Sequence, residues 1–570
     1  MDTRRAILWM IFLMSLLFLW NNWQIYQGQP SLFGGSPTSQ QASVATDAAG
    51  QAAPGAVPEV SDVSVPPPAP SAAEATEVPP SAPAEARVAS RQPIVVASDV
   101  LRLSFDPVGA RIVKAELLKF GAVDDSSRPV VLMNDDPAVL VYTAETGVVG
   151  PAGAGFPTHR TPFAASHVDT ELVGDTLRVS FTASSGGLEV VKTYTLRRGS
   201  YDIAVSHELI NRGEQPVSPS VYFQLTRDNS KPPGESTFYS TFTGPAVYSE
   251  EGKFQKISFS DIADGKGNYV KRTDDGWIAM IQHYFVSAWI PRQGVSRVND
   301  MVSLGNNLYA VRSVEPVGTV QPGASQTVQS SLWIGPQDQN ALEAVAPGLD
   351  LVVDYGWFTV IAKPLFVVMT WLHGMLGNWG WTIVALTVLI KLVFFPLSAA
   401  SYRSMARMKA VAPRLTALRE KYGDDRQKLN AAMMELYRNE KINPLGGCLP
   451  IAVQIPVFIS LYWVLLASVE MRGAPWILWV TDLSARDPYF ILPALMMATM
   501  FLQIKLNPTP PDPMQAKVMM LMPLIFGGMM FFFPSGLVLY WVVNNILSIA
   551  QQWYITRKIA NAPVGAARNV

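Results

Sequence analysis

The sequence predicts a multidomain membrane protein that combines an antiparallel β-sandwich domain with an α-helical membrane bundle of six spans. Three observations predict this fold class. The 570 residues are 49% hydrophobic and only 16% charged, whereas a soluble domain is about a quarter charged. Short runs of alternating polar and apolar residues occupy the first half of the chain, and apolar stretches of helical length occupy the second half.

Charge and cysteine content exclude several other classes of protein. The 44 basic and 45 acidic residues nearly cancel, so the formal net charge of −1 points to no particular partner. The single cysteine excludes an internal disulfide framework and a cysteine-based metal cluster.

The first element that we expect is a transmembrane signal anchor over residues 1–27. Arg4 and Arg5 precede an apolar run at 6–20, and basic residues in front of such a run stay in the cytoplasm. Bulky polar residues follow the run, where a cleavable signal needs small ones; a cleaved signal peptide is the alternative. Residues 28–92 are rich in Pro, Ala and Ser, so we expect a disordered tether.

A β-sandwich domain is predicted over residues 93–345. The runs at 100–105, 176–181 and 190–196 have the period-two alternation of half-buried strands. Turns such as Gly186-Gly187 separate the runs, which is typical of antiparallel sheets. Because the domain follows an anchor whose start lies in the cytoplasm, we expect it on the other side of the membrane.

We predict no catalytic site and no metal site, and therefore no enzyme. The β domain contains four of the five histidines, but they form no metal-binding or nucleophile motif. These four are His159, His167, His207 and His283. His283 lies in the apolar run 277–285, which is predicted to be a core strand. An enzyme that uses the β domain stays open as an alternative.

The second half of the chain contains five further apolar segments, and a membrane span requires about 20 mostly apolar residues. Pro534 interrupts the last apolar stretch, and proline lacks a backbone donor and favours a turn, so we divide that stretch into two helices. The predicted transmembrane helices are 375–397, 446–467, 488–504, 517–533 and 537–555.

Basic residues predict the orientation of these spans. The segment 398–444, a predicted helical hairpin, carries ten basic and five acidic residues, and the positive-inside rule places such a segment in the cytoplasm. Six spans put this hairpin, the loop 505–516 and the tail 556–570 in the cytoplasm, together with both termini. Residues 350–373, which contain Lys363-Pro364, are predicted to be an amphipathic interfacial helix, since a seventh span would invert the basic hairpin.

Lys391 is the most unusual residue of the predicted spans. A charge at the centre of a span costs about 3 kcal/mol on insertion scales. Thr387 lies one turn earlier on the same face, and Gln454 and Asn544 interrupt two other spans. These residues together predict a water-filled, positively charged cavity that opens to the cytoplasm. Snorkelling of the amine to the inner headgroups is the alternative.

Four segments resemble the YidC/Oxa/Alb family of membrane protein insertases in its Gram-negative form. They are NPLGGC at 443–448, DYGW at 354–357, GNWG at 377–380 and FPSGLVLY at 533–540. The resemblance implies a periplasmic supersandwich domain similar to sugar mutarotases and a five-helix insertase core in the bacterial inner membrane. It also implies insertion and folding of inner-membrane proteins, alone or with the Sec translocon, through a hydrophilic groove open to cytoplasm and lipid. No cofactor is implied.

The resemblance implies roles for particular residues. Lys391 falls at the basic groove position; Gram-negative relatives usually have arginine there, so this chain keeps the charge and loses the planar donor fork. Thr387 and Gln454 match polar groove positions, Tyr540 and Trp541 match an aromatic pair that contacts the substrate, and we place Asn544 beside them. Contact with the ribosome and the signal recognition particle system is implied for the cytoplasmic loops, at Tyr402, Arg403, Arg407 and Asp512.

The implied partners are nascent inner-membrane proteins, the Sec translocon with its accessory subunits, and the lipid bilayer. We expect no recognition of nucleic-acid sequence. A solute transporter with a periplasmic sugar-binding domain is the alternative function. Coupled transporters usually carry carboxylates within their spans and repeated halves, and neither is visible in the sequence.

Overall fold

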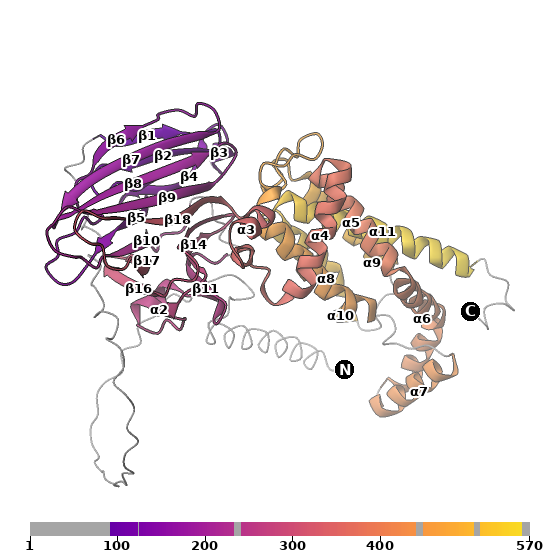
Figure 1. Ribbon diagram of the computed structural model, residues 1–570. Coiled ribbons are helices and arrows are strands. Elements are labelled where there is room, and N and C mark those ends of the chain that lie inside the picture. The colour runs from indigo at the N-terminus through magenta and orange to yellow at the C-terminus, as the bar shows by residue number, and fades with distance from the viewer. Residues whose placement is uncertain are drawn as a thin grey trace, which may run out of the picture.

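The computed structural model describes residues 92–123, 125–232, 241–423, 425–440, 449–506 and 513–560. The predicted anchor, and all of the predicted tether except its last residue, lie outside the described residues. The described chain forms a β-sheet domain followed by a helical region that packs against one end of it (Figure 1).

Two nine-stranded antiparallel sheets form the β domain. The first sheet has the order β1 (Ile94–Ala97), β2 (Leu101–Asp106), β3 (Arg111–Gly121), β4 (Pro129–Asp136), β5 (Leu140–Val149), β10 (Ser220–Asp228), β17 (Leu308–Pro316), β16 (Arg297–Gly305) and β13 (Arg272–Thr273). The second has the order β12 (Lys253–Lys256), β11 (Gly244–Ser249), β14 (Trp277–Gln282), β15 (Phe285–Ile290), β18 (Ser325–Pro336), β9 (Asp202–Asn211), β8 (Leu188–Arg197), β7 (Thr176–Ser185) and β6 (Ala164–Val168). A short helix, α2 (Phe259–Ala263), follows β12.

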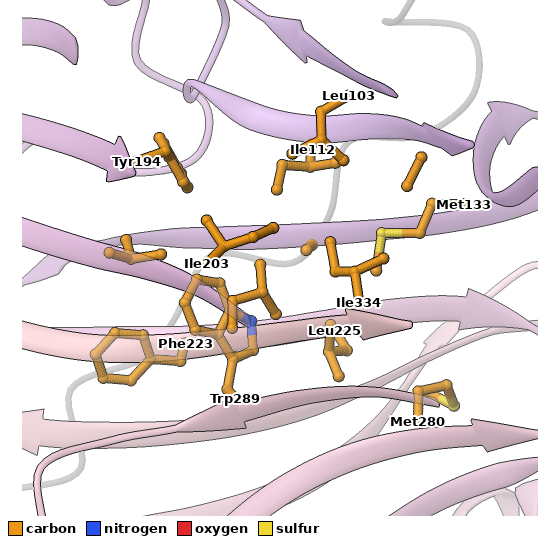
Figure 2. Packing of buried hydrophobic residues seen from close by; sticks show 14 of the residues in the cluster. Leu103, Ile112, Met133, Tyr194, Ile203, Phe223, Leu225, Met280, Trp289 and Ile334 are labelled. Atoms are coloured by element: carbon orange, nitrogen blue, oxygen red, sulfur yellow. The ribbon is translucent and has the colours of Figure 1, made fainter. Parts of the chain in front are cut away.

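Side chains from both sheets form the apolar core of this domain. In β8 and β9, buried residues alternate with partly exposed ones, as expected for strands with one face on a core. Figure 2 shows Leu103 and Leu225 from the first sheet in one cluster with Trp289 and Ile334 from the second. The antiparallel β domain of the predicted fold class is therefore confirmed.

The prediction that His283 lies in a core strand is wrong. The chain reverses at His283 and Tyr284, where Tyr284 has a left-handed φ of 68°, between the strands β14 and β15. Both strands are buried along their whole length, so their apolar residues read as one continuous run. As a consequence of the turn, His283 Nε2 donates to the carbonyl of Leu466 in the helical region at 2.9 Å.

The helical region follows β18. Its short helices are α3 (Gln339–Val345), η2 (Leu349–Val352), η3 (Gly356–Phe358) and η5 (Val469–Met471). Its longer helices are α4 (Thr359–Leu376), α5 (Trp379–Val393), α6 (Phe395–Tyr422), α7 (Arg426–Asn439), α8 (Leu449–Ala467), α9 (Ile491–Leu506), α10 (Pro513–Met530) and α11 (Ser535–Ala560). In Figure 1, α6 and α7 extend away from the β domain.

The segment predicted as the span 375–397 contains parts of three helices. α4 stops at Gly377, whose φ is 65°, and the side chain of Asn378 caps α5 by accepting a backbone N–H. α5 and α6 meet at Phe394 with a bend of 66°. Pro396 stands in the first turn of α6, where its missing N–H costs no helical hydrogen bond.

Helix length limits what the structure says about membrane spans. Among the described residues, Gly356–Leu376 is the one helical segment long and apolar enough to cross a membrane by itself, and the bent pair α5–α6 is a second if it counts as one span. The apolar segments Val453–Ala467, Ile491–Leu506 and Lys517–Met530 are shorter. The six-span count therefore stays a prediction.

Candidate functional site

Lys391 lies in the last turn of α5, and its side chain is held between helices. The residue is 5% exposed. Its Nζ donates to Ser548 Oγ on α11 at 2.8 Å, and Ser548 Oγ donates to the Asn544 carbonyl at 2.7 Å. Within the described part of the chain, no carboxylate pairs with this amine. The hydrogen-bond partner of the Lys391 amine is therefore a neutral hydroxyl, and no negative charge among the described residues balances the positive charge of the amine.

Further polar contacts connect α11 to α8 and α9. Gln454 Nε2 donates to Asn544 Oδ1 at 3.0 Å. Asn545 Nδ2 donates to Thr499 Oγ1 on α9 at 3.2 Å. The helices that carry Lys391 and Gln454 thus both bond to the same turn of α11, at Asn544 and Ser548.

Thr387 is placed differently from the other predicted groove residues. It lies one turn before Lys391, as expected, and it is buried. Its hydroxyl donates to the carbonyl of Ile383 in its own helix at 2.6 Å. The bond to α5 satisfies this donor, so Thr387 contributes an acceptor oxygen to the interior of the bundle.

Aromatic side chains fill the space beside the polar contacts. Tyr540 stacks on Phe458 of α8, with ring centroids 5.7 Å apart. Trp541 lies edge-on to Phe458 at 4.3 Å and packs on Phe526 of α10 at 4.8 Å. Tyr540 is buried and Trp541 is half-buried. The predicted aromatic pair therefore joins α8, α10 and α11.

The residues predicted to contact cytoplasmic partners fall into two groups. Arg403 and Arg407 are exposed on α6. Tyr402 is half-buried on the same helix, so its side chain is less accessible to a partner than the two arginines. Asp512 lies outside the described residues.

Ser548 is a candidate site residue that the sequence analysis did not identify. Its hydroxyl, on α11, accepts a hydrogen bond from Lys391. Its signal is the spacing of Asn544, Ser548 and Gln552, which places polar residues every four positions on one face of an otherwise apolar helix. The sequence contains this spacing, but it does not show that Ser548 lies next to Lys391 of α5.

A second set of charged groups lies inside the β domain. Lys192 Nζ donates to the carbonyls of Gly109 and Thr146 at 2.8 and 2.6 Å, and Arg111 pairs with Glu145 at 3.5 Å. Burial lowers the pKa of the Lys192 amine to about 7. These groups bond to one another and to the backbone, so they stabilise the sandwich. Among the described residues, no three His, Cys, Asp or Glu side chains lie together as metal ligands.

Two family models cover most of the chain. Residues 93–368 match the YidC periplasmic domain, and residues 371–562 match the 60Kd inner membrane protein family. A membrane protein insertase YidC of Bordetella petrii is 65% identical over 572 residues and covers 100% of both chains. The chain belongs to the YidC family of membrane protein insertases. The resemblance predicted from the four sequence segments is therefore confirmed.

Other members of the YidC family are similar along nearly the whole chain. The insertase of Cupriavidus taiwanensis is 53% identical over 560 residues, covering 98% of each chain. A crystal structure of an active YidC insertase with its first transmembrane domain resolved matches with a TM-score of 0.39 and 18% identity, over 82% of this chain and 93% of that one. The names of the two family models make this an inner-membrane family with a periplasmic domain.

Proposed function

We propose that the chain inserts and folds inner-membrane proteins by presenting the charge of Lys391 to polar parts of an incoming segment. The observation that carries this proposal is the position of the amine, which lies among apolar helices with the neutral Ser548 as its partner. An uncompensated cation in such surroundings attracts carboxylates and carbonyls of a passing chain. Attraction of this kind involves no covalent step and no cofactor.

The path of the substrate follows from the residues around Lys391. Gln454 and Asn544 offer amide groups to a hydrophilic tail that is partway across the bilayer. The apolar part of the substrate then moves along the face of α11 that carries Tyr540 and Trp541 into lipid. Burial of apolar surface drives that transfer at roughly 25 cal/mol per Å².

The proposed orientation has six spans, with both termini and the basic hairpin 398–444 in the cytoplasm. The separation of α6 and α7 from the β domain supports this orientation. For α4 we propose an interfacial position, because its exposed face is apolar and Lys363 forms an ion pair with Asp350 at 2.8 Å beside the β domain. The exposed apolar residues of that face are Val360, Val367, Trp371 and Met375.

Cytoplasmic and periplasmic partners are part of the same proposal. Arg403 and Arg407 are exposed cations on α6 and suit contact with the ribosome or the signal recognition particle system. Asp512 is proposed for the same surface. The β domain is proposed to contact accessory subunits of the Sec translocon.

Substitution of Lys391 tests the proposal. In cells depleted of their own insertase, we expect K391A and K391E to lower insertion of a client with an acidic translocated tail by roughly tenfold, which corresponds to about 1.4 kcal/mol. K391R keeps the charge and is expected to retain insertion. K421A removes an exposed cation from α6 and serves as the control. Undiminished insertion with both K391A and K391E would exclude charge attraction.

A further inference from the structure

A cleft lies between α6, α9 and α11, outside the contacts of Lys391. It has a volume of about 310 Å³, within the usual range of ligand sites. Tyr402, Met405 and Lys409 line it from α6, and Trp553 and Arg557 line it from α11. Leu506, the last residue of α9, also lines it.

The charge in this cleft is positive and unpaired. Lys409 and Arg557 are both exposed. Within the described ranges neither forms an ion pair, and no carboxylate lines the cleft. The Arg557 guanidinium lies over the Trp553 ring at 5.2 Å, which holds its charge at the wall of the cleft. The cleft is therefore complementary to an anion.

A row of exposed apolar side chains on α11 extends to the same cleft. Ile546, Ala550 and Trp553 are exposed and follow one another at helical spacing up to Arg557. Tyr554 is 55% exposed beside Trp553. An apolar stripe that ends in exposed Trp, Tyr and Arg is the arrangement of a helix that passes from hydrocarbon to headgroups. The occupant must therefore carry apolar chains on one side and an anionic group on the other.

We propose that this cleft binds the headgroup of an anionic phospholipid. The phosphate lies between Lys409 and Arg557, and the acyl chains lie along Ile546 and Ala550 of α11. Basic pockets between membrane helices on the cytoplasmic side bind anionic headgroups in the same way, because their cations lie at the level of the lipid headgroups. The inference does not depend on the role of Lys391 or on client insertion.

The test uses the full chain purified in a neutral detergent and titrated with phosphatidylglycerol or phosphatidylcholine, with bound lipid counted by native mass spectrometry. We expect preferential binding of phosphatidylglycerol. K409Q/R557Q should weaken that binding by roughly 10- to 30-fold, since each surface cation contributes about tenfold or less. K409R/R557K should retain it, and K421Q/R438Q, which removes two exposed cations elsewhere on α6 and α7, should not change it.

Several results would overturn the proposal. Equal binding of the two lipids, or equal loss in K409Q/R557Q and K421Q/R438Q, would show that no specific headgroup site exists. Complete displacement of the lipid by excess inorganic phosphate would assign the cleft to a free anion. Saturable binding of an acidic peptide that K409Q/R557Q abolishes, without any preference for phosphatidylglycerol, would assign it to a polypeptide.

Discussion

Burial lowers the pKa of His207 to about 3 and that of His283 to about 4, and it also lowers the pKa of His159. Lys192 adds to the effect at His207 by charge repulsion. A histidine with a lowered pKa binds fewer protons in the folded chain than in the unfolded chain, where its pKa is about 6.5. The stability that these residues contribute is therefore present above pH 6.5 and is lost as the pH falls below it.

We predict that the β domain loses stability in mild acid. Between about pH 6 and pH 4, His207 and His283 are each expected to lower the free energy of unfolding by about 1.4 kcal/mol per pH unit. Urea unfolding of the full chain at several pH values, followed through the β-sheet signal, measures this slope.

The variant H207Q separates the histidine effect from general acid unfolding. It removes one titrating group and should flatten the slope, even though it also weakens the contact with Thr146. H167Q removes an exposed histidine and should leave the slope as it is. Identical slopes in H207Q and the unaltered chain would contradict the prediction.

At the scale of elements, the start of α5 depends on a close helix–loop contact. Gly380 lies in the first turn of α5 against Trp476, and a Cβ atom at this position would stand 2.2 Å from Trp476 Cδ1. Asn378, which caps α5, also donates to the Pro475 carbonyl at 3.0 Å. The loop that follows α8 is thus fixed to the start of α5 by both residues.

We predict that G380A destabilises the helical region by about 1–3 kcal/mol, because the added methyl group overpacks the contact with Trp476. G374A is the matched control in α4, where a Cβ atom would meet open space. It should be neutral or stabilising by up to about 1 kcal/mol, since alanine favours helices. Thermal unfolding in detergent compares the two variants; equal midpoints would refute the predicted contact.

At the scale of the whole molecule, Arg472 joins the helical region to the β domain. Its Nη2 donates to the Gly121 carbonyl at 2.8 Å, and its guanidinium lies over the rings of Tyr284 and Phe285. A continuous apolar cluster also spans the two halves and includes β-strand residues such as Trp333 and helical ones such as Phe366. The two halves therefore pack as one body at this end.

We predict that R472A weakens the interaction free energy between the two halves by about 2 kcal/mol, because the variant loses a charge-assisted hydrogen bond and the ring contacts. Differential scanning calorimetry should then show the two halves unfolding further apart in temperature. R102A removes an exposed arginine whose ion pair with Glu116 lies on the surface of β2 and β3, and it should not change the transition. An unchanged transition in R472A would show that the apolar cluster and the other contacts, such as that of His283 with Leu466, join the halves without Arg472.

Sequence patterns were sufficient wherever one local signal decides the structure. The alternation at 176–181 and 190–196 falls within β7 and β8. The segment predicted as a helical hairpin, 398–444, contains most of α6 and all of α7, and Pro534 precedes α11. Lys391 was found because a charge within an apolar run stands out without knowledge of its neighbours.

Other features required contacts between distant residues. Ser548 lies 157 positions from Lys391 along the chain. A local pattern of polar and apolar residues cannot predict a contact between residues so far apart. The turn at His283 was missed because complete burial removes the alternation that separates strands. The bend at Phe394 was missed because composition is apolar on both sides of it.

Composition, periodicity and contiguous motifs were enough to divide the chain into a β-sheet half and a helical half and to identify the basic hairpin and the family. It took the three-dimensional packing to show that Ser548 accepts a hydrogen bond from Lys391 and that Arg472 connects the two halves. These contacts depend on how helices and strands pack in space, and packing brings together residues that no local pattern relates.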